Sequence, residues 1–208
     1  MGVRITAQYF LASGGKRWKL GRGICLTNDS DVFFLHDSFS ELHTSLTATA
    51  DGTAARIIDL ETINAGAGND VIDLTSSDFL LANLDMTLNG EDGNDILWAA
   101  QGSVALNGGA GNDRLNGSSG NDTLTGGSGA DIFEFTITTG SDTIRDYSAA
   151  DGDILRFFKR LGEAEEWSEA SIDTANNSIA WQSKEATVTI DFDTNITESN
   201  LVIEYAFI

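Results

Sequence analysis

A glycine-rich run that ends in an aspartate recurs every nine residues in the middle of the chain. The clearest stretch is GGAGNDRLNGSSGNDTLTGGSGADIFEF, residues 108–135. Related units begin at Ala65 (AGAGNDVID) and at Gly90 (GEDGNDILW), whereas the unit that begins at Ala99 has Val104 where aspartate is expected. A repeat of fixed period restricts the chain to architectures in which one structural unit stacks on the next.

An apolar residue occupies the eighth position of these units and the equivalent position just before them. These residues are Ile63, Ile72, Leu88, Leu97, Leu106, Leu115, Leu124 and Phe133. One inward-facing residue per unit predicts one short strand per unit, and the glycine-rich turn then reverses the chain. Two strands and two turns make one coil, and stacking of the coils provides the core, because a single coil cannot bury its apolar side. The sequence therefore predicts an all-β fold, a parallel β-roll.

The chain divides into three zones. Residues 1–60 are a mixed or β segment that flanks the roll, residues 61–134 are the roll, and residues 135–208 read as a β-rich cap. Alternation of apolar and polar residues in ATVTIDF is the clearest strand pattern of the cap. A short helix is predicted around Glu163–Ala170.

The charge of the chain is strongly negative. It has 32 acidic and 12 basic residues, a formal net charge of −20. This balance argues against nucleic acid and against anionic membrane surfaces as partners, and it suits a protein that takes up cations. No apolar run approaches the ~20 residues of a membrane span. The N-terminal stretch lacks the order of a signal peptide, so we expect a cytoplasmic protein or one exported without an N-terminal signal.

The repeated aspartates indicate cation binding. Alternate turns of a roll stack about 4.8 Å apart, which places Asp95, Asp113 and Asp131 on one edge. Asp70 joins them if residues 74–89 form an enlarged turn. Two such carboxylates repel by roughly 1 kcal/mol in bulk water and by several times that where water screens them only partly. Cations are therefore expected between them. A shell of carboxylate and carbonyl oxygens, without nitrogen or sulfur, favours calcium over magnesium or transition metals.

The units resemble the nonapeptide G-G-x-G-x-D-x-U-x of the repeats-in-toxin (RTX) family, a calcium-binding β-roll motif. GGAGNDRLN and GGSGADIFE match every defined position, and the other three units that contain the aspartate lack one of the first two glycines. The resemblance implies ions between turns eighteen residues apart, held by backbone carbonyls of the first four positions and carboxylates of the sixth. Two or three calcium ions are then expected on this edge. The implied ligands are Asp70, Gly90, Asp92, Asp95, Gly108, Gly109, Ala110, Gly111, Asp113, Gly126, Gly127, Ser128, Gly129 and Asp131.

The opposite edge is expected to bind at most one weaker ion. There Asp122 would stack between Val104 and the turn near Gly140, neither of which offers a carboxylate at the sixth position. Asp122 is therefore either a ligand or a turn residue bonded to backbone amides. In the segment after the repeats, Asp142 or Asp146 either completes a terminal ion site or has an ordinary capping role. The chain ends in IEYAFI, which is either a type I secretion signal or an edge strand.

The resemblance implies a secreted calcium-binding structural module rather than an enzyme. Calcium would trigger folding outside the cell, because the site does not exist in the unfolded chain. This would support export by the type I secretion machinery and presentation of attached domains, which would carry any cell-surface or glycan ligand, as in an adhesin. One alternative is an accessory module of a secreted polysaccharide-active enzyme or protease. The other is a stand-alone enzyme with its active site in residues 1–60.

Overall fold

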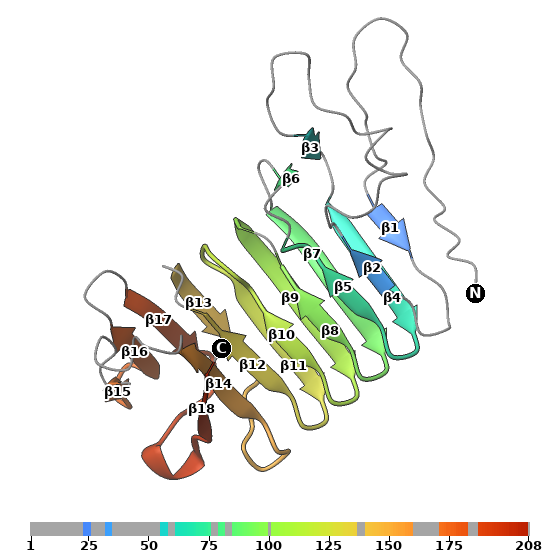
Figure 1. Ribbon diagram of the computed structural model, residues 1–208. Coiled ribbons are helices and arrows are strands. Elements are labelled where there is room, and N and C mark those ends of the chain that lie inside the picture. Colours follow the sequence, from blue (N-terminus) through green and yellow to red (C-terminus); the bar gives the residue numbers. More distant parts are fainter. Residues whose placement is uncertain are drawn as a thin grey trace, which may run out of the picture.

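Two mainly parallel β-sheets form the body of the protein, and through the repeats the chain passes from one sheet to the other at each turn (Figure 1). The structure is a computed structural model. It describes residues 23–25, 32–34, 55–57, 61–75, 79–81, 85–99, 101–136, 140–159, 171–182 and 187–207. The helix expected around residues 163–170 lies outside these ranges, as does most of the segment 1–60.

The strands of the nine-stranded sheet alternate along the chain with those of the other sheet, except the last three, which follow one another. The order of the nine-stranded sheet is β1 (Gly23–Cys25), β4 (Thr62–Ala67), β7 (Asp85–Asp92), β9 (Ser103–Ala110), β11 (Thr123–Ser128), β13 (Gly140–Ile144), β17 (Thr187–Phe192), β16 (Ser178–Gln182) and β15 (Ser171–Asp173). All neighbours pair in parallel except β15, β16 and β17, which pair antiparallel at the C-terminal end.

The seven-stranded sheet is parallel throughout. Its order is β18 (Ile203–Phe207), β14 (Ile154–Lys159), β12 (Ile132–Phe135), β10 (Arg114–Asn116), β8 (Ile96–Trp98), β5 (Val71–Asp73) and β2 (Val32–Phe34). A separate pair joins β3 (Ala55–Ile57) to β6 (Phe79–Leu81), and a short 3₁₀ helix covers Glu198–Asn200.

The nine-residue period sets the register of the central coils. Leu88 pairs with Leu106, and Leu106 with Leu124, a shift of 18 residues per coil. The prediction that two units make one coil is therefore confirmed. The coil between β4 and β7 is longer, since Ile63 pairs with Leu88 at a shift of 25 residues. Of residues 74–89, expected as an enlarged turn, residues 79–81 form β6 and residues 85–89 belong to β7.

The predicted position-eight residues form the core. Those of the nine-stranded sheet stack in one row and those of the seven-stranded sheet in another, and each has no exposed surface. The rows are Ile63, Leu88, Leu106 and Leu124 on one side and Ile72, Leu97, Leu115 and Phe133 on the other. Because each row lies along the stacking direction, every coil depends on its neighbours for burial of its apolar face.

The parallel sheets continue past the last repeat. The shift between coils rises to 20 residues from β11 to β13 and to 22 from β12 to β14. Aromatic side chains fill the core there: the rings of Phe157 and Trp181 lie 4.7 Å apart, and Tyr147 packs against Phe133 and Phe192. The strands expected after residue 135 are therefore present, and β17 shows the predicted alternation of buried and exposed residues.

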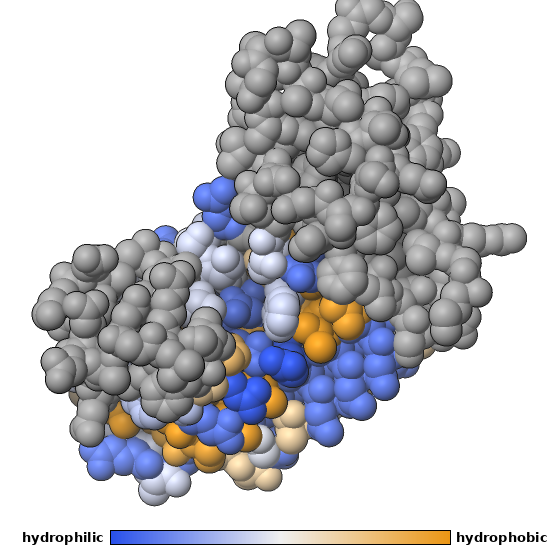
Figure 2. Space-filling view, in the orientation of Figure 1, coloured by the Kyte–Doolittle hydropathy of each residue, from blue (hydrophilic) through white to orange (hydrophobic). Residues whose placement is uncertain are grey.

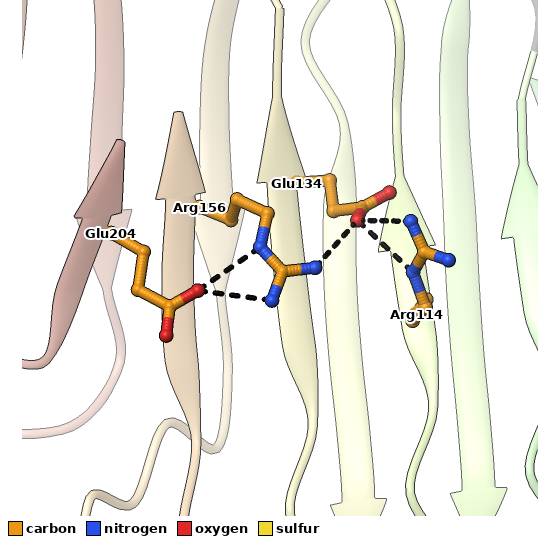
Figure 3. Close-up of polar contacts among 4 residues, drawn as sticks. All are labelled: Arg114, Glu134, Arg156 and Glu204. Carbon is orange, nitrogen blue, oxygen red and sulfur yellow. Dashed lines mark hydrogen bonds and ion pairs between the residues drawn. The ribbon is translucent and has the colours of Figure 1, made fainter. Parts of the chain in front are cut away.

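Charged side chains on the outer face of the seven-stranded sheet form an alternating row (Figure 3). Oε1 of the fully buried Glu134 accepts hydrogen bonds from Nε and Nη2 of Arg114, at 3.0 and 2.6 Å, and from Nη1 of Arg156 at 3.3 Å. Arg156 also donates to Oε2 of Glu204 at 2.9 Å. The guanidinium of Arg114 lies 5.9 Å from the centre of the Trp98 ring. The row therefore links four adjacent strands by opposite charges.

Candidate metal centre

The turns that lead from the nine-stranded into the seven-stranded sheet line one edge of the roll, which we call the first edge. It comprises residues 65–70, 90–95, 108–113, 126–131 and 146–153. These turns lie along the lower right of Figure 1, where the space-filling view has a hydrophilic strip (Figure 2). The second edge comprises the opposite turns, which contain Val104, Asp122 and Asp142.

Backbone contact between stacked turns explains the glycines at positions two and four. Gly109 and Gly111 have φ of 114° and 133°, in the region that side-chain-bearing residues rarely adopt. A Cβ added to Gly109 would lie 2.0 Å from the carbonyl oxygen of Glu91, and one on Gly111 would lie 1.8 Å from that of Gly93. At Gly109 and Gly111 the turn therefore touches the main chain of the turn below, with no room for a side chain.

A different contact explains the glycine at position one, and the sequence pattern alone did not predict it. A Cβ on Gly108 would lie 2.3 Å from Oδ2 of Asp113 and 2.5 Å from the carbonyl oxygen of Gly126. A Cβ on Gly90 would lie 2.4 Å both from Oδ2 of Asp95 and from the carbonyl oxygen of Gly108. A carboxylate of one turn and a carbonyl of the next coil therefore converge beside each of these two glycines.

The position-six aspartates of the first edge form a continuous buried ladder. The backbone N–H of each donates to Oδ1 of the aspartate in the next coil: Asp70 to Asp95 at 2.7 Å, Asp95 to Asp113 at 2.8 Å and Asp113 to Asp131 at 2.8 Å. The predicted stacking of Asp70 below Asp95, through the enlarged turn, is therefore present. Each of these residues has at most 1% of its surface exposed.

In three of these residues the second carboxylate oxygen has no hydrogen-bond partner among the residues that the structure describes. Oδ2 of Asp95, Asp113 and Asp131 is buried without a hydrogen-bond partner in the described part of the chain. An uncompensated buried carboxylate is costly, and proteins normally resolve it by protonation or by a bound cation. Three such oxygens in one row are an observation that fits an ion beside them.

Burial makes these carboxylates easier to protonate when no cation is present. It raises the pKa of Asp113 from 3.8 to about 7, and the carboxylates of Asp131 and Asp95 add to the rise, while the hydrogen bond from the backbone of Asp95 opposes it. Burial likewise raises the pKa of Asp95 and of Asp131 to about 6. Protons and cations therefore compete for the same oxygens.

The donors along the first edge are all oxygens. In the described residues, no three His, Cys, Asp or Glu side chains converge into a metal-binding group, so carboxylate pairs would need backbone carbonyls to complete a shell. The expected carbonyls of Asp92, Ala110 and Ser128 accept hydrogen bonds from the glycines Gly68, Gly93 and Gly111 at 2.7–2.8 Å. A carbonyl oxygen has a second lone pair, which leaves them able to bind a cation. The donor set fits calcium, which accepts six to eight oxygens in flexible geometry.

The second edge differs from the expectation in one respect. The backbone N–H of Val104 donates to Oδ1 of Asp122 at 2.8 Å, as the stacking predicted, and Val104 offers no carboxylate. On the other side, however, the N–H of Asp122 donates to Oδ1 of Asp142 at 3.0 Å. The prediction that neither stacking neighbour of Asp122 offers a carboxylate is therefore wrong for the following coil. Two extra residues in this coil place Asp142 next to Asp122 in the stack. Oδ2 of Asp122 is also buried and unpartnered in the described residues.

Asparagines at position five stabilise the stacking, a role that the sequence analysis missed. The backbone N–H groups of Asn94, Asn112 and Ala130 donate to Oδ1 of Asn69, Asn94 and Asn112, at 2.8, 2.7 and 2.8 Å. The signal was present in the recurring Asn-Asp pair of the turns. Its asparagine joins the coils at the surface while its aspartate faces inward.

A family profile described as the RTX calcium-binding nonapeptide repeat matches four copies, over residues 61–78, 87–103 and 106–134. The chain carries RTX repeats. The resemblance stated from the sequence is thus confirmed, and the RTX repeats bind Ca²⁺ as a structural β-roll. No curated protein matches the chain. The part of the chain that the structure describes has no helix long and apolar enough to cross a membrane.

Proposed function

We propose that this RTX chain is a secreted structural module whose roll folds when calcium binds along the first edge. The observation that supports this is the row of buried, unpartnered Oδ2 atoms on Asp95, Asp113 and Asp131 among the described residues. As carboxylates, these groups oppose stacking of the coils. A divalent ion between successive aspartates turns that repulsion into attraction.

The proposed ions lie between neighbouring rungs of the ladder. One uses Asp95 with Asp113, a second uses Asp113 with Asp131, and a third uses Asp70 with Asp95. Carbonyls of the glycine-rich positions complete each shell. On the second edge, Asp122 and Asp142 support one weaker ion, since Val104 ends the row below them.

Calcium dependence suits export through the type I machinery. Cytosolic free calcium is low, so the repulsion among the carboxylates keeps the repeats unfolded before export. Outside the cell, ion binding supplies folding free energy, because the complete site exists only in the folded state. The folded roll would then present attached domains, as in an adhesin or another exoprotein.

A calcium titration followed by far-UV circular dichroism tests the calcium-binding role. We expect a cooperative gain of β-sheet signal with calcium and no comparable gain with magnesium at the same concentration. Magnesium is the control because it demands near-ideal octahedral geometry and releases its water reluctantly. A calcium-stripped protein with the same spectrum and melting temperature as the calcium-loaded one would refute the proposal.

Export is tested separately. A reporter domain fused ahead of the chain, in a bacterial host with and without a type I transporter, should reach the medium only with the transporter. Retention of the reporter in both hosts contradicts the export role and leaves the calcium titration to decide the rest.

A further inference from the structure

Three asparagine–glycine steps lie at the junctions between repeat units. The pairs are Asn89 with Gly90, Asn107 with Gly108 and Asn116 with Gly117, and the sequence contains no others. Glycine has no Cβ and a freely turning backbone, so its backbone nitrogen can approach the side-chain carbon of the preceding asparagine without steric hindrance. An asparagine in this position is therefore open to attack by its own chain. The calcium sites proposed above assign no role to these asparagine side chains.

Two of these asparagines belong to a ladder of amides on the outer face of the nine-stranded sheet. Asn64, Asn89 and Asn107 pair in register on β4, β7 and β9. Nδ2 of Asn107 donates to Oδ1 of Asn89, and Nδ2 of Asn89 donates to Oδ1 of Asn64, both at 2.7 Å. All three residues are partly buried. The ladder therefore ties the amides of Asn89 and Asn107 to neighbouring strands.

The backbone at these two steps is fixed as well. Asn89 and Gly90 both lie within β7, and Asn107 and Gly108 both lie within β9. In a parallel strand ψ is about +115°, which turns the next backbone nitrogen away from the side chain. An attack on the side chain needs a large rotation about this bond, and that rotation would break the pairing of β7 with β9. The folded strands therefore keep the attacking nitrogen and its target apart.

We propose that Asn89 and Asn107 are deamidation sites that are closed in the folded roll and react when the coils separate. The backbone nitrogen of the following glycine attacks Cγ of the asparagine and gives up its proton, the side-chain nitrogen leaves as ammonia, and a cyclic imide remains. A water molecule then hydrolyses the imide at either of its carbonyls and leaves aspartate or isoaspartate. Water is the only co-reactant, and nothing is oxidised or reduced. The link between calcium and this chemistry rests on the proposed calcium-dependent folding.

The products do not fit the folded roll. A carboxylate at position 107 has no N–H to donate to Oδ1 of Asn89, so two acceptors would face each other in the ladder. Isoaspartate lengthens the backbone by one methylene just before Gly108, where a Cβ would already lie 2.5 Å from the carbonyl oxygen of Gly126. Each reaction also adds a negative charge to a chain of net charge −20. Time spent without calcium therefore turns a reversible unfolding into a lasting loss of the ability to refold.

Peptide mapping by mass spectrometry tests these sites on the full chain, incubated at neutral pH in saturating calcium, in chelator, or in chelator with urea. We expect deamidation of Asn89 and Asn107 to be at least about tenfold slower in calcium than in urea, because the folded strands react only through local opening. The matched control is Asn112, which precedes Asp113 rather than a glycine and should react slowly in all three samples.

The outcomes separate the two proposals. If the chelator sample reacts as slowly as the calcium sample while the urea sample reacts much faster, the closed sites stand and the proposed calcium-dependent folding fails. If Asn89 and Asn107 react at one rate in all three samples, protection by the folded strands is refuted, and circular dichroism of the same samples shows separately whether calcium has folded the roll. In urea both should match Asn116, which lies outside the ladder, and equally fast reaction of Asn112 would refute the role of glycine.

A pair of substitutions tests the consequence for refolding. Thr125 pairs with Asn107 at the corresponding place in the next coil, so threonine suits this row of the sheet. After a long incubation in chelator, we expect the double variant Asn89→Thr/Asn107→Thr to recover more of its β-sheet signal than the unsubstituted chain when calcium returns. Equal recovery of the two proteins would overturn the proposed loss of refolding. If the variant does not fold, the peptide map of the unsubstituted chain still decides whether the sites are closed in the roll.

Discussion

Oδ1 of Asp113 accepts a 2.8 Å hydrogen bond from the backbone N–H of Asp95 in the coil below. Asp95, Asp113 and Asp131 of the first edge therefore each have two separable roles. In each, Oδ1 holds the backbone of the neighbouring coil, and Oδ2 faces the space beside a glycine, where we propose that calcium binds. Replacement of aspartate by asparagine keeps an oxygen for the first role and removes the charge needed for the second.

This separation predicts unequal effects on the two edges. Asp113 has an aspartate both below and above it, whereas Asp122 has Val104 on one side and Asp142 on the other. Asp113→Asn should therefore raise the calcium midpoint of folding, measured by far-UV circular dichroism, more than Asp122→Asn does. Equal midpoints for the two variants would contradict the placement of most ions on the first edge.

The stability of the calcium-free roll should fall as pH rises. Burial raises the folded-state pKa of Asp95, Asp113 and Asp131 above 3.8, to about 6, 7 and 6. The protonated groups therefore favour folding below pH 4, and this contribution is lost as pH rises through 6 to 7. The β-sheet signal in far-UV circular dichroism, measured in calcium-stripped buffer, should therefore decrease from pH 4 to pH 7.5. A signal that increases over this range would disprove the assignment.

Calcium affinity should change with pH in the opposite direction to the stability of the calcium-free roll. The ion binds the deprotonated carboxylates, so calcium affinity should increase from pH 5 to pH 7.5 as protons leave the same oxygens. Isothermal titration calorimetry at several pH values measures the affinity, and calcium binding at pH 5 should release protons to the buffer. Affinity that does not depend on pH would show that the buried aspartates are not the ligands.

Gly111→Ala should destabilise the roll by at least ~3 kcal/mol. The new Cβ would lie 1.8 Å from the carbonyl oxygen of Gly93, and φ of 133° adds backbone strain. The control is Ala110→Ser, at an exposed position of the same turn, which should change stability by less than about 0.5 kcal/mol. Chemical denaturation in saturating calcium provides the comparison, and similar midpoints for the two variants would count against close stacking of the turns.

Glu134→Gln should lower the free energy of unfolding of the protein by about 1–2 kcal/mol, because it weakens the outer charged row. The buried carboxylate accepts from both Arg114 and Arg156, and hydrogen bonds to charged groups contribute more than neutral ones. Glu204→Gln at the exposed end of the row should cost less than about 0.5 kcal/mol. Equal losses in urea denaturation would mean that burial of Glu134 adds nothing to its ion pairs.

The period of nine residues, read from the sequence alone, determined the coil, the inward apolar rows and the stacking of Asp95, Asp113 and Asp131. Periodicity sufficed there because every coil has the same length, so counting along the chain is equivalent to moving up the roll. The stacking of Asp70 below Asp95 could also be predicted across the longer segment before Gly90, since the repeat resumes in the same pattern after it.

Only the tertiary structure placed Asp142 above Asp122 and Asp153 above Asp131. Those coils contain 20 and 22 residues, more than the 18 of a coil made of two repeats. No local sequence pattern predicts whether the extra residues lie in a turn or in a strand. The same holds for the position-one glycines, which are required by an oxygen that approaches from within the turn rather than by φ. The sequence pattern predicts contacts between coils of equal length, because the same positions stack at each level. Where coils differ in length, the contacts depend on the path of the backbone through each turn. Packing against the coil below determines that path.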